Sequence, residues 1–438
     1  MKKSSSIRYE SLENGVWVAT ESLPHVRSAS LGVYLDTGSR DETPALNGLS
    51  HFFEHMVFKG TSRLDPLDIV RCFEATGGQV NAYTSKEQTC FYGKVVDTEV
   101  EPALNVLLDM VLDARFDSID VAKEKEVVIE EIRSVDDSPD ELAYELFSHA
   151  AFGDHALGRP IAGTAKSVRS LNRDMLVRHR EAARKQVPVV VAAAGRVDHE
   201  TVVAQVRRRF KLKNRPVGAV GANGRSPLQP RPFLERKPAE FGIHHLHRSK
   251  DVQQATVILG GPGYAWKSKQ RYALTLLHCA LGDGMSSKLF QNLRETHGLV
   301  YSIYSNPEFF ACEGLFSIGF ATEPKNLRKA VIEIGRELSI LRKKGLTAKE
   351  LDFAKENVTG GILLSLESTS SRMSSLARRL LGGKPEETLE QVIGQIRAVT
   401  REDVLRCARE ILRPEAWASA AVLPKGVKAD FGAMLAKV

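Results

Sequence analysis

Two histidines and a glutamate lie within five positions of the chain, in the stretch HFFEH at residues 51–55. The longer segment NGLSHFFEHMVFKGT is densely apolar, and it predicts one helix that is nearly surrounded by protein. At 3.6 residues per turn, His51 and His55 lie one turn apart on one helix face, with Glu54 beside them. The two imidazole rings can therefore converge on a single metal ion.

The alternative is that each histidine is a buried ring with one hydrogen-bond partner, which is the commoner situation for a lone histidine. Three features favour a metal site. The histidines have i, i+4 spacing, a carboxylate lies next to them, and burying such groups unpaired in apolar surroundings costs on the order of several kcal/mol. Because the pattern H-x-x-E-H also occurs among zinc peptidases, the metal interpretation leads.

A catalytic zinc ion needs three protein ligands and an open position for water, so a further ligand must come from elsewhere in the chain. The segment VAKEKEVVIEEIRSVDD predicts an amphipathic helix on which Glu124 and Glu131 lie two turns apart on one face. Glu131 can complete a His-His-Glu site, and Glu124 can orient a ligand or the water from behind it. A solvated face of Glu and Lys pairs explains the same pattern, and the residues alone do not decide between the two.

The order of elements suggests an internal duplication. A chain of 438 residues is long for one domain, and the segment 213–240, rich in Pro, Gly and Arg, predicts a linker between domains at 1–212 and 241–438. Each half carries a strand, two helices, two hairpin-like strands and then long helices, so we expect an α+β fold with two homologous α/β-sandwich domains. The second half has TLLHCAL where the first has HFFEH, which predicts one metal site per chain.

Composition excludes several classes of function. The net charge of +7 is spread over both signs without a basic stripe interleaved with aromatics, so nucleic-acid binding has no support. The five cysteines are far apart and never form a CxxC pair, and no run of about 18 apolar residues predicts a membrane span. We therefore expect a soluble cytoplasmic protein without a membrane partner.

Several runs together resemble one family. They are GLSHFFEHMVFKGT, NAYTSKEQTCFY, EKEVVIEEI, HALGRPIAGT and GMSSKLFQNLRETHGLVYSI. The chain is similar over nearly its whole length to the inverzincin zinc metallopeptidases that include pitrilysin, insulin-degrading enzyme and the mitochondrial processing peptidase. In that family a glutamate some 76 residues past the second histidine completes the zinc site, and 131 − 55 = 76. The resemblance thus implies His51, His55 and Glu131 as zinc ligands, in preference to Glu130, and Glu54 as the general base.

The resemblance also implies how a peptide substrate is held. Asn81 and Ala82 match an edge strand that grips an extended peptide through its main chain, and Arg294 and Tyr301 match side chains that donate to substrate carbonyls. Without the resemblance, these residues would be an exposed strand edge, a surface arginine and a half-buried strand tyrosine. Longer family members enclose a clamshell chamber with four such domains, so a chain with two is expected to form a homodimer.

The function expected from the sequence is therefore a zinc endopeptidase with one zinc ion per chain, acting on oligopeptides or short unfolded segments. Two alternatives stay open. One is a non-catalytic scaffold or partner subunit of the same fold, against which the complete set of His51, Glu54, His55 and Glu131 argues. The other is a processing peptidase for one dedicated precursor, which differs only in its substrate.

Overall fold

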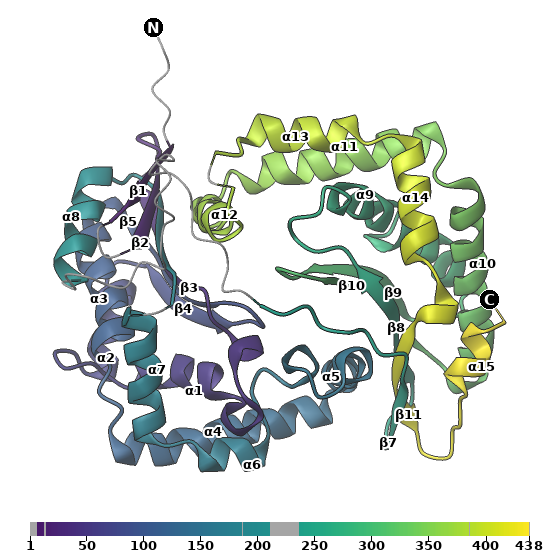
Figure 1. Ribbon diagram of the computed structural model, residues 1–438, viewed down its shortest axis with the longest axis horizontal. Helices are drawn as coiled ribbons and strands as arrows, with labels where there is room; N and C mark the ends of the chain where they lie inside the picture. Colours follow the sequence, from purple (N-terminus) through teal and green to yellow (C-terminus); the bar gives the residue numbers. More distant parts are fainter. Residues whose placement is uncertain (1–6, 13–14, 186, 211–235, 385, 438) are drawn as a thin grey trace, which may run out of the picture. The chain divides into compact units, whose positions relative to one another are not determined.

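The computed structural model describes residues 7–12, 15–185, 187–210, 236–384 and 386–437, and these form two compact units (Figure 1). The first unit draws on Met1–Ile132, Pro160–Arg236 and Leu364–Glu387, and the second on Arg133–Arg159, Lys237–Leu363 and Thr388–Val438. Each unit contains one mixed sheet covered by helices, which confirms the α+β prediction with two domains. Most of the expected linker, up to residue 235, lies outside the described residues.

The first unit contains a six-stranded sheet in the order β1-β2-β6-β3-β5-β4. All neighbouring strands are antiparallel except β2 and β6, which are parallel. The strands are β1 (Ile7–Ser11), β2 (Val16–Ser22), β3 (Ser28–Leu35), β4 (Gln79–Thr84), β5 (Thr89–Val96) and β6 (Val189–Gly195). Among the described strands, β4 pairs with β5 alone, so it forms one edge of this sheet.

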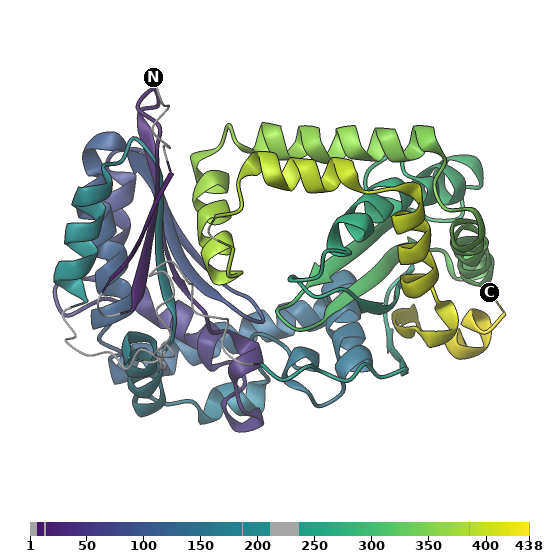
Figure 2. The ribbon, with the colours of Figure 1, turned by 45° about the horizontal axis from the view of Figure 1, so that its top comes forward.

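Both faces of the first sheet are covered, because strand side chains alternate between two apolar cores. On one face the sheet packs with α1, α3 and α8, and on the other with α12 (Figure 2). The helices of this unit are α1 (Leu49–Val57), α2 (Pro66–Glu74), α3 (Val100–Asp113), α4 (Ser118–Asp137, as far as residue 132), α6 (Ala165–Ser170), α7 (Arg173–Lys185), α8 (His199–Arg209) and α12 (Thr369–Leu381).

The second unit contains a five-stranded sheet in the order β7-β11-β8-β10-β9. Its strands are β7 (His245–Lys250), β8 (Ala255–Gly263), β9 (Ser302–Phe309), β10 (Gly314–Thr322) and β11 (Ala418–Pro424). Its helices are α5 (Pro139–Phe152), α9 (Arg271–Gly282), a π-helical turn (Phe290–Thr296), α10 (Leu327–Lys344), α11 (Ala348–Ser365), α13 (Leu389–Ala398), α14 (Arg401–Ile411) and α15 (Phe431–Leu435). As in the first unit, both faces of the sheet are apolar and covered.

The two sheets share one topology, as an internal duplication requires. Strands β7, β11, β8, β10 and β9 take the places of β2, β6, β3, β5 and β4 in the first sheet. The pair β7 and β11 is parallel, like β2 and β6, and the other neighbours are antiparallel in both sheets. Strand β1 has no counterpart and extends only the first sheet.

The contiguous division at residues 1–212 and 241–438 needs one correction, because each unit takes a helix from the other half of the chain. Helix α5 packs its Phe147 and Ala150 on the second sheet, whereas α12 packs Met373 and Leu376 on the first. An amphipathic sequence shows that a helix covers an apolar surface, but it does not show which surface. The sequence therefore predicts contiguous domain boundaries, although in the structure each compact unit includes one helix from the other half of the chain.

Candidate metal centre

Helix α1 begins at a glycine and is capped by a distant carboxylate. Gly48 has a φ of +96°, a conformation that favours glycine, and the Glu42 carboxylate accepts hydrogen bonds from the backbone N–H groups of Gly48 (2.8 Å) and Ser50 (2.6 Å). Glu42 thereby satisfies two of the free N–H groups at the helix start, as an N-cap side chain would, and its negative charge suits the helix N-terminus.

The apolar face of α1 is completely buried, because Phe52, Phe53, Met56 and Val57 have no exposed surface. Burial of this face leaves a polar stripe that contains His51, Glu54 and His55, whose side chains are only partly buried. Packing therefore fixes which way the polar residues face. The sequence prediction of one helix over HFFEH is confirmed.

His51, His55 and Glu131 come together at the junction of α1 and α4. His51 Nε2 lies 3.6 Å from Glu131 Oε1, and His55 Nε2 lies 3.4 Å from Glu131 Oε2. The two imidazole centroids are 4.6 Å apart, and one donor atom from each of the three residues lies within 4.8 Å of the others. Within the described part of the chain, this is the one such group of three or more histidine, cysteine or acidic side chains.

The donor set suits zinc in both chemistry and spacing. Zinc binds imidazole nitrogen and carboxylate oxygen at about 2.0 to 2.2 Å, so two donors of a tetrahedral site are about 3.4 Å apart. Glu131 Oε1 lies 3.6 Å from His51 Nε2, and Glu131 Oε2 lies 3.4 Å from His55 Nε2, so each oxygen is close to that separation from one histidine. Glu131 is 46% exposed, whereas His51 and His55 are 12% and 22% exposed, so the site opens on the glutamate side. Three donors with one open side match a catalytic rather than a structural zinc site.

Glu124 orients His55 from behind the donor set. Its Oε1 lies 2.9 Å from His55 Nδ1, and its Oε2 lies 2.6 Å from the Lys59 ammonium nitrogen. Glu124 is only 6% exposed, so it needs these two partners to remain charged. Acceptance of the Nδ1 proton by Glu124 leaves His55 Nε2 free to act as the metal donor, as is usual for ligating histidines.

The charges of this network shift the pKa values of its members. Burial opposes the imidazolium form of His55, but hydrogen bonds to Glu124 and Glu131 outweigh burial and raise the His55 pKa to about 9. Hydrogen bonds from His51 and His55 hold the pKa of Glu131 well below its usual range. Burial opposes ionisation of Glu124, yet its bonds to His55 and Lys59 lower its pKa. Without a metal ion, the positive charges of His55 and Lys59 therefore balance the two glutamates.

Glu54 and the predicted edge strand lie next to this cluster in the same unit. The Thr84 hydroxyl donates a hydrogen bond of 2.6 Å to Glu54 Oε2, and Thr84 is the last residue of β4. Asn81 and Ala82 lie on the same strand, where Asn81 is exposed and its Oδ1 accepts from the Ala82 N–H at 2.8 Å. The first unit thus contains the three donor residues, the Glu54 carboxylate and the edge strand β4.

Arg294 and Tyr301 belong to the second unit, and their role stays a prediction. Arg294 lies in the π-helical turn, and its guanidinium carbon is 4.8 Å from the Phe290 ring centroid and 5.8 Å from that of Tyr301. Tyr301 is 70% exposed, more than the half-buried strand residue that its sequence suggested. Arg294 and Tyr301 are therefore brought together at the surface of the second unit.

The second unit has no equivalent metal site among its described residues. In α9, which corresponds to α1, His278 Nδ1 lies 2.8 Å from the Ser305 hydroxyl oxygen, and the nearest acidic partner, Asp283, is 3.9 Å from Nε2. Among the described residues, the donor cluster thus occurs in one of the two duplicated units, and one zinc ion per chain stays a prediction.

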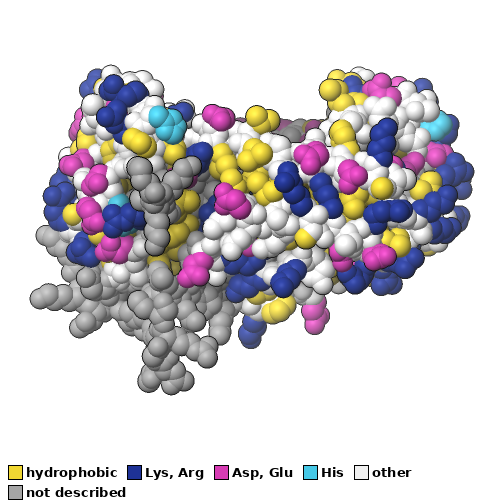
Figure 3. Space-filling view, turned by 90° about the horizontal axis from the view of Figure 1, so that it is seen from above, with side chains coloured by type: hydrophobic (Ala, Val, Ile, Leu, Met, Phe, Trp, Pro, Cys, Tyr) yellow, Lys and Arg dark blue, Asp and Glu magenta, His cyan; other side chains and the backbone are white. Residues whose placement is uncertain are grey.

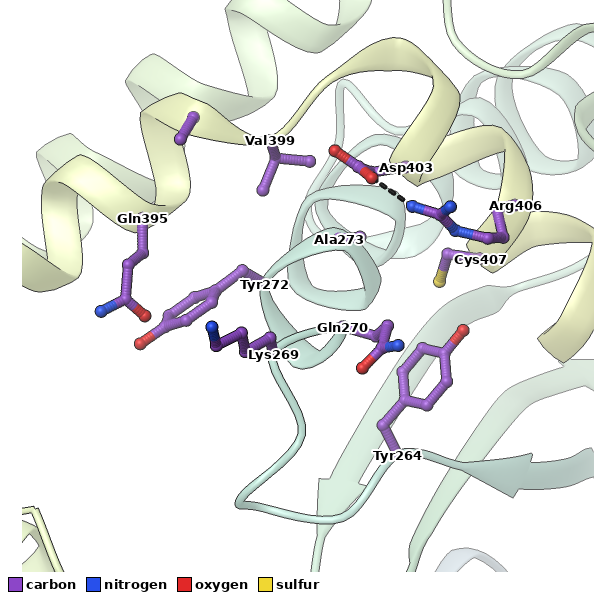
Figure 4. Close-up of a pocket in the computed structure, with 11 residues that line it drawn as sticks. Tyr264, Lys269, Gln270, Tyr272, Ala273, Gln395, Val399, Asp403, Arg406 and Cys407 are labelled. Atoms are coloured by element: carbon purple, nitrogen blue, oxygen red, sulfur yellow. Dashed lines mark hydrogen bonds and ion pairs between the residues drawn. The ribbon is translucent and has the colours of Figure 1, made fainter.

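A cavity of about 420 Å³ lies in the second unit (Figure 4). It lies among the start of α9, α13 and α14. Its Arg406 forms an ion pair with Asp403, and burial raises the pKa of the Cys407 thiol to about 12. A thiol with that pKa is protonated at neutral pH and is a poor nucleophile. Cys407 is therefore not a candidate nucleophile.

Sequence reasoning missed three residues of the centre: Glu42, Lys59 and Thr84. Each acts across a distance that depends on the fold, for example the 30 positions that separate Thr84 from Glu54. Of the three, Lys59 was the easiest to predict from the sequence, because it follows His55 by four positions, the spacing of neighbours on one helix face. No periodic pattern connects Glu42 or Thr84 to the helix.

The sequence places the chain in a family. Residues 17–165 match the family described as insulinase (peptidase family M16), and residues 170–358 match the peptidase M16 inactive domain. The chain therefore belongs to peptidase family M16, which confirms the resemblance found from its motifs.

Bacterial proteins of similar length are similar to this chain in sequence. A Bacillus subtilis protein named uncharacterized zinc protease YmxG is 39% identical over 421 residues, which cover 96% of this chain and 99% of that protein. A Streptomyces coelicolor protein, also named an uncharacterized zinc protease, is 39% identical over 407 residues, 93% of this chain and 87% of the relative. The names of both relatives imply zinc as their metal.

Solved structures share the fold at lower identity. A protease from Helicobacter pylori aligns with a TM-score of 0.84 at 24% identity and covers 95% of this chain and 99% of its own. A chain of complex III from Candida albicans aligns with a TM-score of 0.80 at 19% identity and covers 98% of this chain and 99% of its own. One fold therefore occurs in a protease and in a chain of complex III.

Charged side chains of both signs lie on the surface of the protein (Figure 3). On the face drawn in Figure 3, Lys and Arg side chains are interspersed with Asp and Glu rather than forming one basic stripe. Among the described residues, no helix is long and apolar enough to cross a membrane.

We predict that zinc binding releases at least one proton at pH 7.5, because His55 must lose the proton that its raised pKa retains. Below a pKa of about 9 the metal-free His55 is charged, so the apparent zinc affinity rises about tenfold per pH unit until that pKa is reached. Titration calorimetry of metal-free protein in buffers of different ionisation enthalpy measures the released protons. A binding enthalpy that is the same in every buffer would contradict the prediction.

We also predict that His51→Ala, His55→Ala and Glu131→Gln each lower zinc occupancy at least tenfold, because each removes one of three donors. Glu130→Gln is the matched control, since it changes the adjacent carboxylate in the same way and leaves the donor set intact. Zinc content after dialysis against a chelator decides the matter. Equal loss in the Glu130 variant would mean that the wrong glutamate has been assigned.

Proposed function

We propose that this protein is a zinc-dependent endopeptidase that hydrolyses oligopeptides or short unfolded segments, with one zinc ion held by His51, His55 and Glu131. The proposal rests on the position of Glu54. It lies on the helix of the two histidines, yet it is outside the donor set, and among the described residues its carboxylate has one hydrogen bond, from Thr84 to Oε2. An acid or base next to three ligands is the arrangement that hydrolysis requires.

The residues divide the chemistry among themselves. Zinc, when bound, polarises a carbonyl and lowers the pKa of water to about 7. Glu54 accepts the proton of the attacking water through its free oxygen and then donates it to the leaving amine. Glu124 holds the Nδ1 proton of His55, which keeps Nε2 directed at the metal. Lys59 keeps Glu124 ionised throughout.

The proposed substrate is a peptide in extended conformation. Edge strand β4 offers its free side for main-chain pairing, with Asn81 and Ala82 at the contact, and this mode of binding selects little for sequence. Arg294 and Tyr301 are proposed to donate to substrate carbonyls, and the exposure of Tyr301 is compatible with that role. A peptidase for general oligopeptides and a processing peptidase for one dedicated precursor would differ only in their substrate.

We further propose that the protein acts in the cytoplasm as a homodimer whose four units enclose the active site. The support is indirect: the chain duplicates one sheet topology, and one of the two units has the cluster of donors. The unit without metal donors would then line the substrate-binding chamber.

A scaffold function is the second candidate, because the same fold occurs in complex III of Candida albicans. The complete polar set argues against it here. Burying Glu124 and two histidines costs stability unless they are paired, and a subunit with only packing to do has no use for them.

We predict that Glu54→Gln retains zinc and loses at least about a thousandfold in kcat for peptide cleavage, because the base is removed while the three donors remain. Glu126→Gln, an exposed glutamate on α4, is the control for the loss of one carboxylate. Cleavage of a fluorogenic peptide and zinc content are measured on the same preparations. Cleavage by Glu54→Gln at a rate close to wild type would exclude Glu54 as the base.

We predict strong selection against folded substrates, because both the sheet edge and an enclosed active site require a free, extended backbone. One cleavable sequence is presented as a flexible peptide and as a loop in a stable folded host. The peptide should be cleaved at least a hundredfold faster. Equal rates would exclude the enclosed chamber and leave the zinc chemistry unaffected.

A further inference from the structure

The Glu54 carboxylate is held by a single side chain. Thr84 Oγ1 lies 2.6 Å from Glu54 Oε2 and 3.4 Å from the carbonyl oxygen of Ser50. A hydroxyl has one proton, so it is donated to the nearer, ionised oxygen. Among the described residues, Thr84 provides the one hydrogen bond that reaches the Glu54 carboxylate. The second carboxylate oxygen therefore has no protein donor in this part of the chain.

The position of Thr84 is itself tightly fixed. Thr84 ends strand β4 and is paired with Thr89 of β5, and a turn follows in which the Ser85 N–H donates to the Gln88 carbonyl at 2.7 Å. Threonine is branched at Cβ, so few χ1 rotamers are open to it in a strand. The hydroxyl thus has a defined place relative to the sheet, unlike that of a serine on a loop.

We propose that Thr84 is a positioning residue for Glu54, an assignment that rests on the proposed role of Glu54 as the base. By holding Oε2, Thr84 fixes the carboxylate rotamer and leaves Oε1 directed to the proton of the attacking water. The same bond links the base to β4, the strand that Asn81 and Ala82 share. A peptide paired with β4 is thereby kept in register with the group that acts on it.

The test compares Thr84→Val, which keeps the branched shape and removes the donor, with Thr84→Ser, which keeps the donor. Thr84→Val should lower kcat about tenfold or more, the usual effect of losing a hydrogen bond to a charged group. KM, zinc content and melting temperature should change little, and Thr84→Ser should restore most of kcat. Thr76→Val makes the same change at an exposed position of the first unit and should have no effect.

A second comparison separates positioning from general damage. Glu54→Asp shortens the side chain and withdraws the carboxylate from Thr84, so Thr84→Val should lower kcat less than twofold further in that background. Full kcat in Thr84→Val would overturn the inference, and so would a loss of zinc or stability that Thr84→Ser does not repair. If Glu54→Gln is inactive while Thr84→Val is fully active, only this inference fails. If Glu54→Gln is active, the proposed function fails first.

Discussion

The metal centre depends on the requirement that α1 bury one face completely. Four large apolar side chains, Phe52, Phe53, Met56 and Val57, have no exposed surface, and their burial sets the rotation of the helix about its axis. The only positions left for His51, Glu54 and His55 are on the opposite stripe, where α4 supplies Glu131. A rotation of one residue, about 100°, would bury charged groups and expose phenyl rings. Hydrophobic packing therefore provides the precision that the donor set needs.

Charge balance connects this helix to α4. Glu124 is nearly fully buried and remains ionised because His55 and Lys59 both contact it. Removal of one partner from a buried ion pair leaves an uncompensated charge, which costs more than the pair contributes. The same contacts that stabilise the junction of α1 and α4 also select Nε2 as the nitrogen of His55 that is available as a metal donor. The atoms that stabilise this junction would therefore also support the proposed binding of zinc.

The sequence predicted much of this, and the remainder depends on the fold. Spacing of i, i+4 is enough to place His51 and His55 on one face, because helix geometry is local. Glu131 lies on another helix, so the residues alone left it undecided and the resemblance was needed to choose it over Glu130. The contact of Thr84 with Glu54 and the exchange of α5 and α12 come from packing between elements distant in sequence. Periodicity within one element contains no information about such contacts.

The most direct test of the central claim is anomalous scattering at the zinc absorption edge from crystals of the metal-loaded protein. The account predicts one strong peak per chain, within about 2.0 to 2.2 Å of His51 Nε2, His55 Nε2 and a carboxylate oxygen of Glu131, with Glu124 and Glu54 not coordinated. The absence of a peak at the junction of α1 and α4, or coordination through Glu130 instead of Glu131, would contradict it.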